Sequence, residues 1–209
     1  MGLPKIGKST AMSKLPHALI CDLEGKGYDG IDVAALARTT TLDELKKACI
    51  WFFSSQNTTF EVLVIDHIRV LTSFFSSDIA RENGTRFVEE VEFGKGTAHL
   101  RKNIDSFLKW LNAMLAATPD RYVILVAHAI DRNSEVRLDV DGKNETMILS
   151  LVDAVGFIDR ENGQTMVDFH ARRGVEFGAR NSALAAYDGV LDWSLLFKIA
   201  EGKEIAPAS

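Results

Sequence analysis

The most specific chemical pattern in the chain is its opening, MGLPKIGKST. Gly2, Gly7, Lys8 and Ser9 fit the spacing G-x-x-x-x-G-K-[ST]. A loop of this kind wraps backbone N–H groups around phosphate oxygens, while its lysine supplies a positive charge and its hydroxyl reaches Mg²⁺. The two glycines allow the backbone angles and the close approach that such a loop needs. The opening therefore predicts a site for a triphosphate with its magnesium.

We expect the whole opening loop to contact the phosphates. The predicted contacts are Gly2, Leu3, Pro4, Lys5, Ile6, Gly7, Lys8, Ser9 and Thr10. Residues 8–14 are expected to form a helix whose first turn faces the phosphates, because unpaired N–H groups and the helix dipole favour anions there. An ordinary Gly/Lys turn is the alternative interpretation of the same residues.

A second candidate is the acidic end of the apolar segment Val62-Leu-Val-Ile-Asp66. A buried strand that ends in an aspartate places a carboxylate at the carboxyl edge of the sheet. There Asp66 is expected to hold the Mg²⁺ that Ser9 also binds, directly or through water. The alternative is an aspartate that only forms a turn.

The segment Cys21-Asp22-Leu23-Glu24-Gly25 ends another apolar run. Glu24 is the candidate to activate the water that attacks the γ-phosphate. Asp22 is expected on the same side, bound to Lys8 or to a further water. A pair of turn carboxylates is the alternative.

His128 closes a further apolar run, Val126-Ala127-His128. At that position a polar side chain can sense hydrolysis of the γ-phosphate and move the loop that follows. A histidine with a purely structural role is the alternative interpretation.

Arginines near the carboxyl-terminal end are candidates for a contribution from a neighbouring subunit, where one arginine can stabilise the transferred charge. Arg173 is the working assignment, and Arg172 and Arg180 stay open as alternatives. Simple surface solvation accounts equally well for any one of them.

Basic residues outside these motifs are candidates for contact with a nucleic-acid backbone. They are Arg132, Arg137 and Lys143 after His128, and Lys95, Arg101 and Lys102 earlier in the chain. Aromatic residues do not interleave with them, as they do in many single-strand binding sites. The formal net charge of −5 also argues against a uniformly basic DNA-binding protein, although local basic loops can still bind phosphates.

Alternating helical and strand-like segments must position these residues. Continuous apolar runs predict strands over residues 17–22, 60–66 and 121–128. Helical spacing of apolar residues predicts helices over residues 42–55, 67–81 and 97–117. This alternation predicts an α/β fold with a mostly parallel sheet sandwiched by helices.

The carboxyl-terminal part is expected to add antiparallel strands at one edge of that sheet. Residues 134–147 read as a hairpin around Asp141-Gly142. Residues 153–159 and 165–171 read as a second hairpin joined at 161–163. Residues 187–199 are weakly patterned. We expect one domain over residues 1–200 and a tail over 201–209.

Composition limits the class of protein. The chain has 209 residues, 46% of them hydrophobic, and no apolar run of the 18 or more residues that span a membrane. No signal peptide is recognised, so a cytoplasmic location without a membrane partner is expected. Cys21 and Cys49 have no metal-site spacing and are expected to be buried free thiols.

In their order along the chain, these segments resemble the RecA-like ATPases of phages and prophages, the AAA-type single-strand annealing proteins that act as recombination mediators. The similarity covers residues 2–181 and runs through GLPKIGKST, DLEGKGYD, VLVIDHIRVL, RYVILVAH, VDAVGFIDRENG and FGARN. The resemblance implies a RecA-type fold that binds and hydrolyses ATP with Mg²⁺. It also implies ssDNA as ligand, a single-strand DNA-binding protein as partner, and a bacterial host cell.

The resemblance also implies a role for each matching residue. Lys8 would bind phosphate, Ser9 and Asp66 would hold Mg²⁺, Glu24 would activate water and His128 would sense the γ-phosphate. RecA-like ATPases place the site between subunits, which implies a homo-oligomer, ring or filament, with an arginine in trans.

One departure from this family is that only Met1 precedes the phosphate loop, so the strand that should enter the loop is missing. A parallel sheet without that strand would expose two long apolar edges. Three explanations stay open: residues lost upstream of Met1, another segment or chain that fills the gap, or a degenerate protein that no longer hydrolyses ATP.

Two other functions remain open from the sequence. A small-molecule phosphotransferase uses the same kind of loop but requires an arginine-rich lid and a closed acceptor pocket. A nucleotide-dependent interaction module without turnover is the non-enzymatic alternative.

Overall fold

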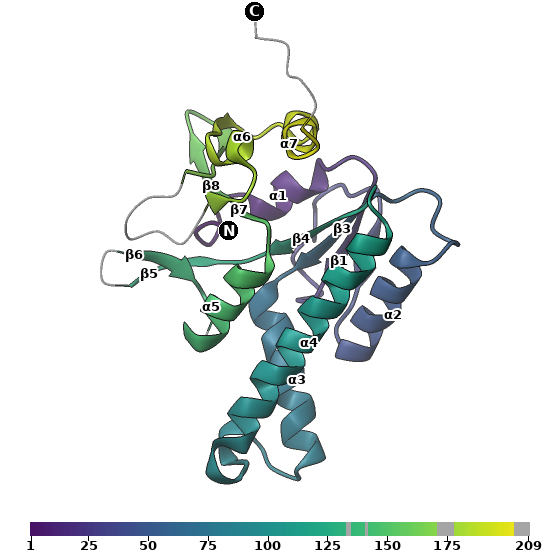
Figure 1. Cartoon of the computed structure of the whole chain (residues 1–209), viewed down its shortest axis with the longest axis vertical. Coiled ribbons are helices and arrows are strands. Elements are labelled where there is room, and N and C mark those ends of the chain that lie inside the picture. The colour runs from purple at the N-terminus through teal and green to yellow at the C-terminus, as the bar shows by residue number, and fades with distance from the viewer. Residues whose placement is uncertain (133–134, 141, 171–177, 203–209) are drawn as a thin grey trace, which may run out of the picture.

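The computed structural model describes residues 1–132, 135–140, 142–170 and 178–202 (Figure 1). Its main sheet has four parallel strands in the order β2-β1-β3-β4. Their bounds are Ala18–Asp22 for β1, Leu36–Arg38 for β2, Val62–Asp66 for β3 and Tyr122–Val126 for β4. The predicted α/β fold with a parallel sheet is confirmed, and β2 is a strand that the sequence patterns did not indicate.

The register of this sheet aligns the ends of its strands. Asp22, the last residue of β1, pairs with Asp66, the last residue of β3. Asp66 in turn pairs with Val126, which ends β4 two residues before His128. The acidic residues and the histidine singled out by the sequence therefore lie along one edge of the sheet.

Helices cover both faces of the sheet, because alternate side chains of its central strands are buried on opposite sides. One face packs Leu19, Cys21, Leu63 and Ile65 against the first group of helices. These helices are α2 (Leu42–Phe53), α3 (Ile68–Glu82), α4 (Lys95–Ala117) and α5 (Gly142–Leu151). On the other face, Ala18, Ile20, Val62 and Val64 pack against α1 (Lys8–Ser13), α6 (Ser182–Ala185) and α7 (Trp193–Ala200).

The predicted helices form within a few residues of their expected bounds. α2 begins at a capping box, in which the Thr41 side chain accepts from the Glu44 N–H and the Glu44 carboxylate accepts from the Thr41 N–H. α3 and α4 extend together away from the sheet (Figure 1). The short 3₁₀ helices η1 (Val88–Glu90) and η2 (Glu92–Gly94) lie in their connection.

Met1 and Gly2 lie between the end of β4 and the start of β8 (Phe157–Glu161). Gly2 forms one parallel bridge with His128: its N–H donates to Ala127 O, and its carbonyl accepts from the Ala129 N–H. The Met1 carbonyl accepts from the Ile158 N–H. In the described part of the chain, this bridge is the only strand-like pairing that leads into the phosphate loop.

The prediction of a hairpin over residues 134–147 is wrong, because the hairpin lies earlier in the chain. Strands β5 (Ala129–Arg132) and β6 (Glu135–Leu138) pair antiparallel, and α5 starts at Gly142 where a second strand was expected. Asn144, Glu145 and Ile148 are buried at helical spacing. The Glu145 carboxylate accepts from the Leu138 N–H at 2.7 Å, which fastens α5 to the hairpin.

The second predicted hairpin is confirmed by β8 and β9 (Gln164–Asp168), which pair antiparallel around the turn at 162–163. β11 (Asp188–Val190) adds to β9, and β7 (Ala154–Val155) pairs with β10 (Gly178–Ala179). Contrary to the expectation, these strands form small sheets of their own and do not extend the edge of the main sheet.

Residues 187–199, which are weakly patterned in the sequence, form β11 and most of α7. Leu196 and Ile199 are buried, and the Trp193 indole N–H donates to Ala11 O at 3.0 Å. α7 is therefore packed against α1, the helix that follows the phosphate loop. Within the described ranges, no helix combines the length and the hydropathy required to cross a bilayer.

Candidate active site

The opening loop has the backbone conformation of a phosphate cradle. Lys5 and Gly7 have φ angles of +62° and +93°, in the left-handed region that only glycine adopts without strain. Gly7 then caps α1, and its carbonyl accepts from the Ala11 N–H. Alternating backbone angles of this kind turn successive N–H groups toward one concavity, where they favour an anion.

This concavity is a cavity of about 250 Å³. It is lined by Lys5, Gly7, Lys8, Ser9, Thr10, Asp22, Glu24, Gly27, Ile31, Asp66, His67 and His128. Its volume lies just below the 300–1,000 Å³ range of small-molecule sites. The cavity therefore fits the phosphates and metal of a nucleotide better than a whole nucleotide.

Five of the predicted loop contacts line the cavity, and the other four do not. Gly2, Leu3, Pro4 and Ile6 are absent from its lining, and Leu3 is 44% exposed. Gly2 and Leu3 act instead through their carbonyl groups, which contact Lys8.

Lys8 is buried, and its ammonium group donates three hydrogen bonds. The acceptors are Gly2 O at 2.9 Å, Leu3 O at 2.7 Å and His128 Nδ1 at 2.8 Å. Burial lowers the pKa of Lys8, and the negative charges of Asp66 and Glu24 partly offset this effect. The lysine therefore lies within electrostatic reach of both predicted carboxylates.

Asp66 is 9% exposed, and its Oδ2 accepts from the Tyr28 hydroxyl at 2.7 Å. Burial is the main cause that raises the pKa of Asp66. A carboxylate in such a place is stabilised by a cation. The oxygens of Asp66, Ser9, Glu24 and Asp22 around one cavity are the hard ligands that Mg²⁺ prefers. The residues present thus fit a magnesium ion, which Ser9 and Asp66 would hold.

The two carboxylates after β1 have different surroundings. Asp22 is 1% exposed and accepts from the N–H groups of Gly25 and Gly27, both at 3.1 Å. Of the two predicted partners of Asp22, Lys8 bonds elsewhere, and the contact with a further water stays a prediction. Glu24 is exposed and lines the cavity, as a residue that activates water requires.

His128 lines the cavity as predicted, and the structure adds His67 beside it. The two imidazole rings lie 4.1 Å apart at an angle of 60°. His67 is 3% exposed, and among the described residues neither of its ring nitrogens has a hydrogen-bond partner. Burial, followed by the charges of His128 and Lys8, lowers the pKa of His67 to about 4.

Sequence reasoning missed His67 and Tyr28. His67 directly follows the strand-end Asp66, and that position is the signal that could have identified it. Tyr28 stands in a glycine-rich loop four residues after Glu24, and it is 2% exposed. Its contact with Asp66 spans 38 residues of sequence, so no local pattern indicates it.

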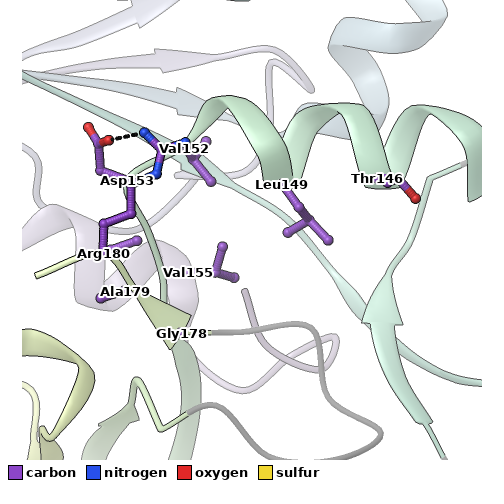
Figure 2. A pocket seen from close by; sticks show the side chains of 9 residues that line it. Thr146, Leu149, Val152, Asp153, Val155, Gly178, Ala179 and Arg180 are labelled. Atoms are coloured by element: carbon purple, nitrogen blue, oxygen red, sulfur yellow. Dashed lines mark hydrogen bonds and ion pairs between the residues drawn. The ribbon is translucent and has the colours of Figure 1, made fainter. Parts of the chain in front are cut away.

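Of the candidate arginines, Arg172 and Arg173 lie outside the described residues. Arg180 lines a different cavity, of about 390 Å³, formed by the end of α5 with β7 and β10 (Figure 2). There its guanidinium donates to Asp153 Oδ1 and to Ser150 O, each at 2.8 Å. Within its own chain Arg180 is thus bound away from the phosphate loop.

The basic residues proposed for nucleic-acid contact differ in their surroundings. Arg137 on β6 lies 3.5 Å from the buried Glu145 carboxylate, so part of its charge is offset. Lys95, Arg101, Lys102 and Lys143 are exposed. Arg132 ends β5.

Comparison with known protein families decides the class of this site. A family model described as an AAA domain matches residues 1–182, which include the phosphate loop and the aligned strand ends. The chain belongs to the AAA domain family. No curated protein is similar enough to the chain to count as a match. As an AAA domain with a P-loop, the chain is of the class that binds and hydrolyses nucleoside triphosphates.

Proposed function

We propose that this AAA domain is a DNA-recombination ATPase that binds and hydrolyses ATP and acts on single-stranded DNA, as a phage-type single-strand annealing protein or recombination mediator. One observation carries the ATPase part. Lys8, Ser9, Asp66, Glu24 and His128, from four separate segments, line a single cavity. The DNA part is supported by the order of the sequence motifs and by the position of the β5–β6 hairpin.

In the proposed reaction, Lys8 and the loop N–H groups bind the phosphates of ATP. Ser9 and Asp66 would hold Mg²⁺, which when bound would neutralise negative charge on the phosphates. Tyr28 fixes the orientation of the Asp66 carboxylate through its hydrogen bond. These residues position the γ-phosphate and exchange no proton with it.

Glu24 accepts a proton from the attacking water at the open side of the cavity. His128 lies beside Lys8 and senses the γ-phosphate. We assign Arg173 to a trans contribution from a neighbouring subunit of a homo-oligomeric ring or filament. A neighbouring subunit would also enlarge a cavity whose volume of about 250 Å³ lies below the range of small-molecule sites.

The DNA-contacting element in this proposal is the β5–β6 hairpin, which begins directly after His128. It carries Arg132 and Arg137, and Lys143 is exposed just beyond it on α5. A single-strand DNA-binding protein is the proposed partner, and the bacterial cytoplasm is the proposed location.

The test is ATP turnover by the chain with and without ssDNA, beside Lys8→Ala. The proposal expects turnover that ssDNA increases and that Lys8→Ala abolishes. The exposed Lys14, at the end of α1, provides Lys14→Ala as a matched control. Turnover that ignores ssDNA but responds to a nucleoside or sugar acceptor would instead assign a phosphotransferase, and binding without turnover would assign an interaction module.

A further inference from the structure

His67 is an unusual side chain for the interior of this protein. It is 3% exposed, and each of its ring nitrogens is buried without a hydrogen-bond partner among the described residues. A buried polar atom without a partner destabilises the fold, so nearly all such atoms in native proteins have one. The loop cavity and the ring of His128 lie directly beside it.

His128 lies beside His67, but its Nδ1 is bonded to Lys8. The Lys8 ammonium donates to His128 Nδ1 at 2.8 Å, and its other two protons go to Gly2 O and Leu3 O. An ammonium group has three protons, so all of them are in use. Lys8 must therefore give up at least one of these bonds when it takes a phosphate oxygen.

We propose that His67 is the second hydrogen-bond partner of His128, which turns from Lys8 to His67 when the lysine moves onto a phosphate. The rings lie 4.1 Å apart between their centroids and are tilted by 60°, so a rotation of the side chains brings two nitrogens together. One ring then donates its N–H to the unprotonated nitrogen of the other. The exchange gives both histidines a partner.

The consequence of this exchange is a signal to the β5–β6 hairpin. The carbonyl of His128 accepts from the Asp139 N–H at 2.9 Å, and Asp139 follows β6. Ala129, the residue after His128, begins β5, and its N–H donates to Gly2 O at 2.9 Å. One end of the hairpin is thus joined to His128 by the chain, and the other end by a hydrogen bond. This signal and its phosphate trigger rest on the proposed ATPase function, whereas the exchange itself requires only that the bond from Lys8 to His128 is lost.

The direct test is nitrogen NMR of the full chain labelled with ¹⁵N-histidine. The chain has five histidines, and His67→Phe and His128→Phe assign the two rings. Lys8→Met removes the ammonium group without any nucleotide. We expect it to shift the ring-nitrogen resonances of both His67 and His128, while Lys14→Met leaves them in place.

The double variant Lys8→Met with His67→Phe separates exchange from simple loss of Lys8. If His128 gives the same resonances with and without His67 in the Lys8→Met background, the proposal is overturned. Should Lys8→Met fail to fold, the wild-type chain is measured with Mg²⁺ and a non-hydrolysable ATP analogue, and the same shifts of the His67 and His128 ring-nitrogen resonances are expected. A wild-type chain that does not bind the analogue refutes the proposed function alone. The spectra of Lys8→Met, or of Lys8→Leu if Lys8→Met does not fold, then decide the exchange.

Turnover gives an independent readout. His67→Phe is expected to lower kcat about tenfold, the value of one hydrogen bond, with nucleotide affinity within about twofold. His67→Asn, which keeps a donor and an acceptor near the position of Nδ1, is expected to recover most of the loss. His99→Phe, on the exposed side of α4, is the matched control. Equal losses of affinity and kcat in His67→Phe, without recovery in His67→Asn, would contradict a positioning role.

Discussion

Burial moves the pKa values of Lys8 and Asp66 in opposite directions. It lowers that of the ammonium group and raises that of the carboxyl group, because both charged forms lose contact with water. A magnesium triphosphate supplies what both groups lack, since its phosphate oxygens pair with the lysine and its metal pairs with the aspartate. The two residues are therefore set to bind opposite charges of one ligand.

Tyr28→Phe tests how Asp66 is oriented. The change removes the hydroxyl that donates to Asp66 Oδ2 at 2.7 Å and leaves the ring in place. Since a hydrogen bond to a charged group is worth about 1.5–3 kcal/mol, we expect the affinity for Mg²⁺-ATP to fall roughly tenfold or more. Titration with a fluorescent ATP analogue measures this. The control is Tyr187→Phe, which removes a hydroxyl that donates to Val190 O. Equal affinities in the two variants would refute the role of Tyr28.

The two cysteines are predicted to be inert in the folded protein. Cys21 and Cys49 are both 0% exposed, and burial raises the pKa of Cys21 to about 12 and raises that of Cys49 as well. Because the thiolate is the reactive form, a thiol reagent at pH 8 should label neither residue until denaturant is added. Rapid labelling of the native protein would contradict the burial of this core.

At the scale of the elements, the junction between α2 and β3 depends on polar side chains rather than on a hydrophobic pattern. The Asn57 amide donates to Phe52 O and Phe60 O, and its oxygen accepts from the N–H groups of Thr59 and Phe60. The Arg121 guanidinium also donates to Phe52 O and lies over the Phe52 ring. This junction fixes where β3 starts and so where Asp66 lies.

Asn57→Ala is expected to lower the free energy of unfolding by about 2–3 kcal/mol, because four side-chain hydrogen bonds to the backbone of Phe52, Thr59 and Phe60 are lost. Urea denaturation measures the change. Gln56→Ala, at the neighbouring exposed position, should stay within about 0.5 kcal/mol of the wild type. If both variants were equally stable, the junction would not depend on this side chain.

Regular elements were predictable from the sequence where one pattern dominated. The strands ending at Asp66 and Val126 are continuous apolar runs, and α4 has a clear apolar stripe. Around Gly142 the pattern predicted a hairpin turn, but a helix starts there, because the same turn residues are compatible with a helix start. The helix is favoured by the buried hydrogen bond from the Leu138 N–H to Glu145, a tertiary contact that local propensity does not contain.

The site residues were likewise predictable where a local pattern indicated them, and not where a tertiary contact defines them. Lys8, Ser9, Glu24, Asp66 and His128 were predictable, because the carboxyl ends of parallel strands meet at one edge beside the loop. His67 and Tyr28 were not, since each acts through a contact with another side chain. Gly2, Leu3, Pro4 and Ile6 do not line the cavity, and their contact with the phosphates stays a prediction.

At the scale of the whole molecule, the carboxyl-terminal part supports the phosphate loop from outside. α7 packs on the same face of the sheet as α1, and the Trp193 indole N–H donates to Ala11 O. Tyr122 on β4 adds a hydrogen bond to Glu201 at 2.6 Å just after α7. The family match ends at residue 182, before α7, so this support lies outside the part that defines the family.

Trp193→Ala is therefore expected to affect both stability and the nucleotide site. Loss of the indole removes buried apolar area and the bond to α1, which should lower the free energy of unfolding by about 2–4 kcal/mol. Because α1 carries Lys8 and Ser9, the variant should also bind Mg²⁺-ATP more weakly, so the nucleotide should raise its melting temperature less than that of the wild type. Thermal unfolding with and without nucleotide measures both effects. An equal rise in both proteins would show that α7 supports the sheet but not the loop.

Calorimetric titration of the full chain with ATP, in the presence and absence of Mg²⁺, tests most directly whether the phosphate-loop cavity binds the nucleotide. The arrangement of Lys8, Ser9 and Asp66 predicts one Mg²⁺-dependent ATP site per chain. Lys8→Ala should weaken binding by about 100-fold or more, because a charged contact to phosphate is lost, and Lys14→Ala should not weaken it. Binding of equal strength in wild type and Lys8→Ala, or no binding by the folded wild type, would contradict the account.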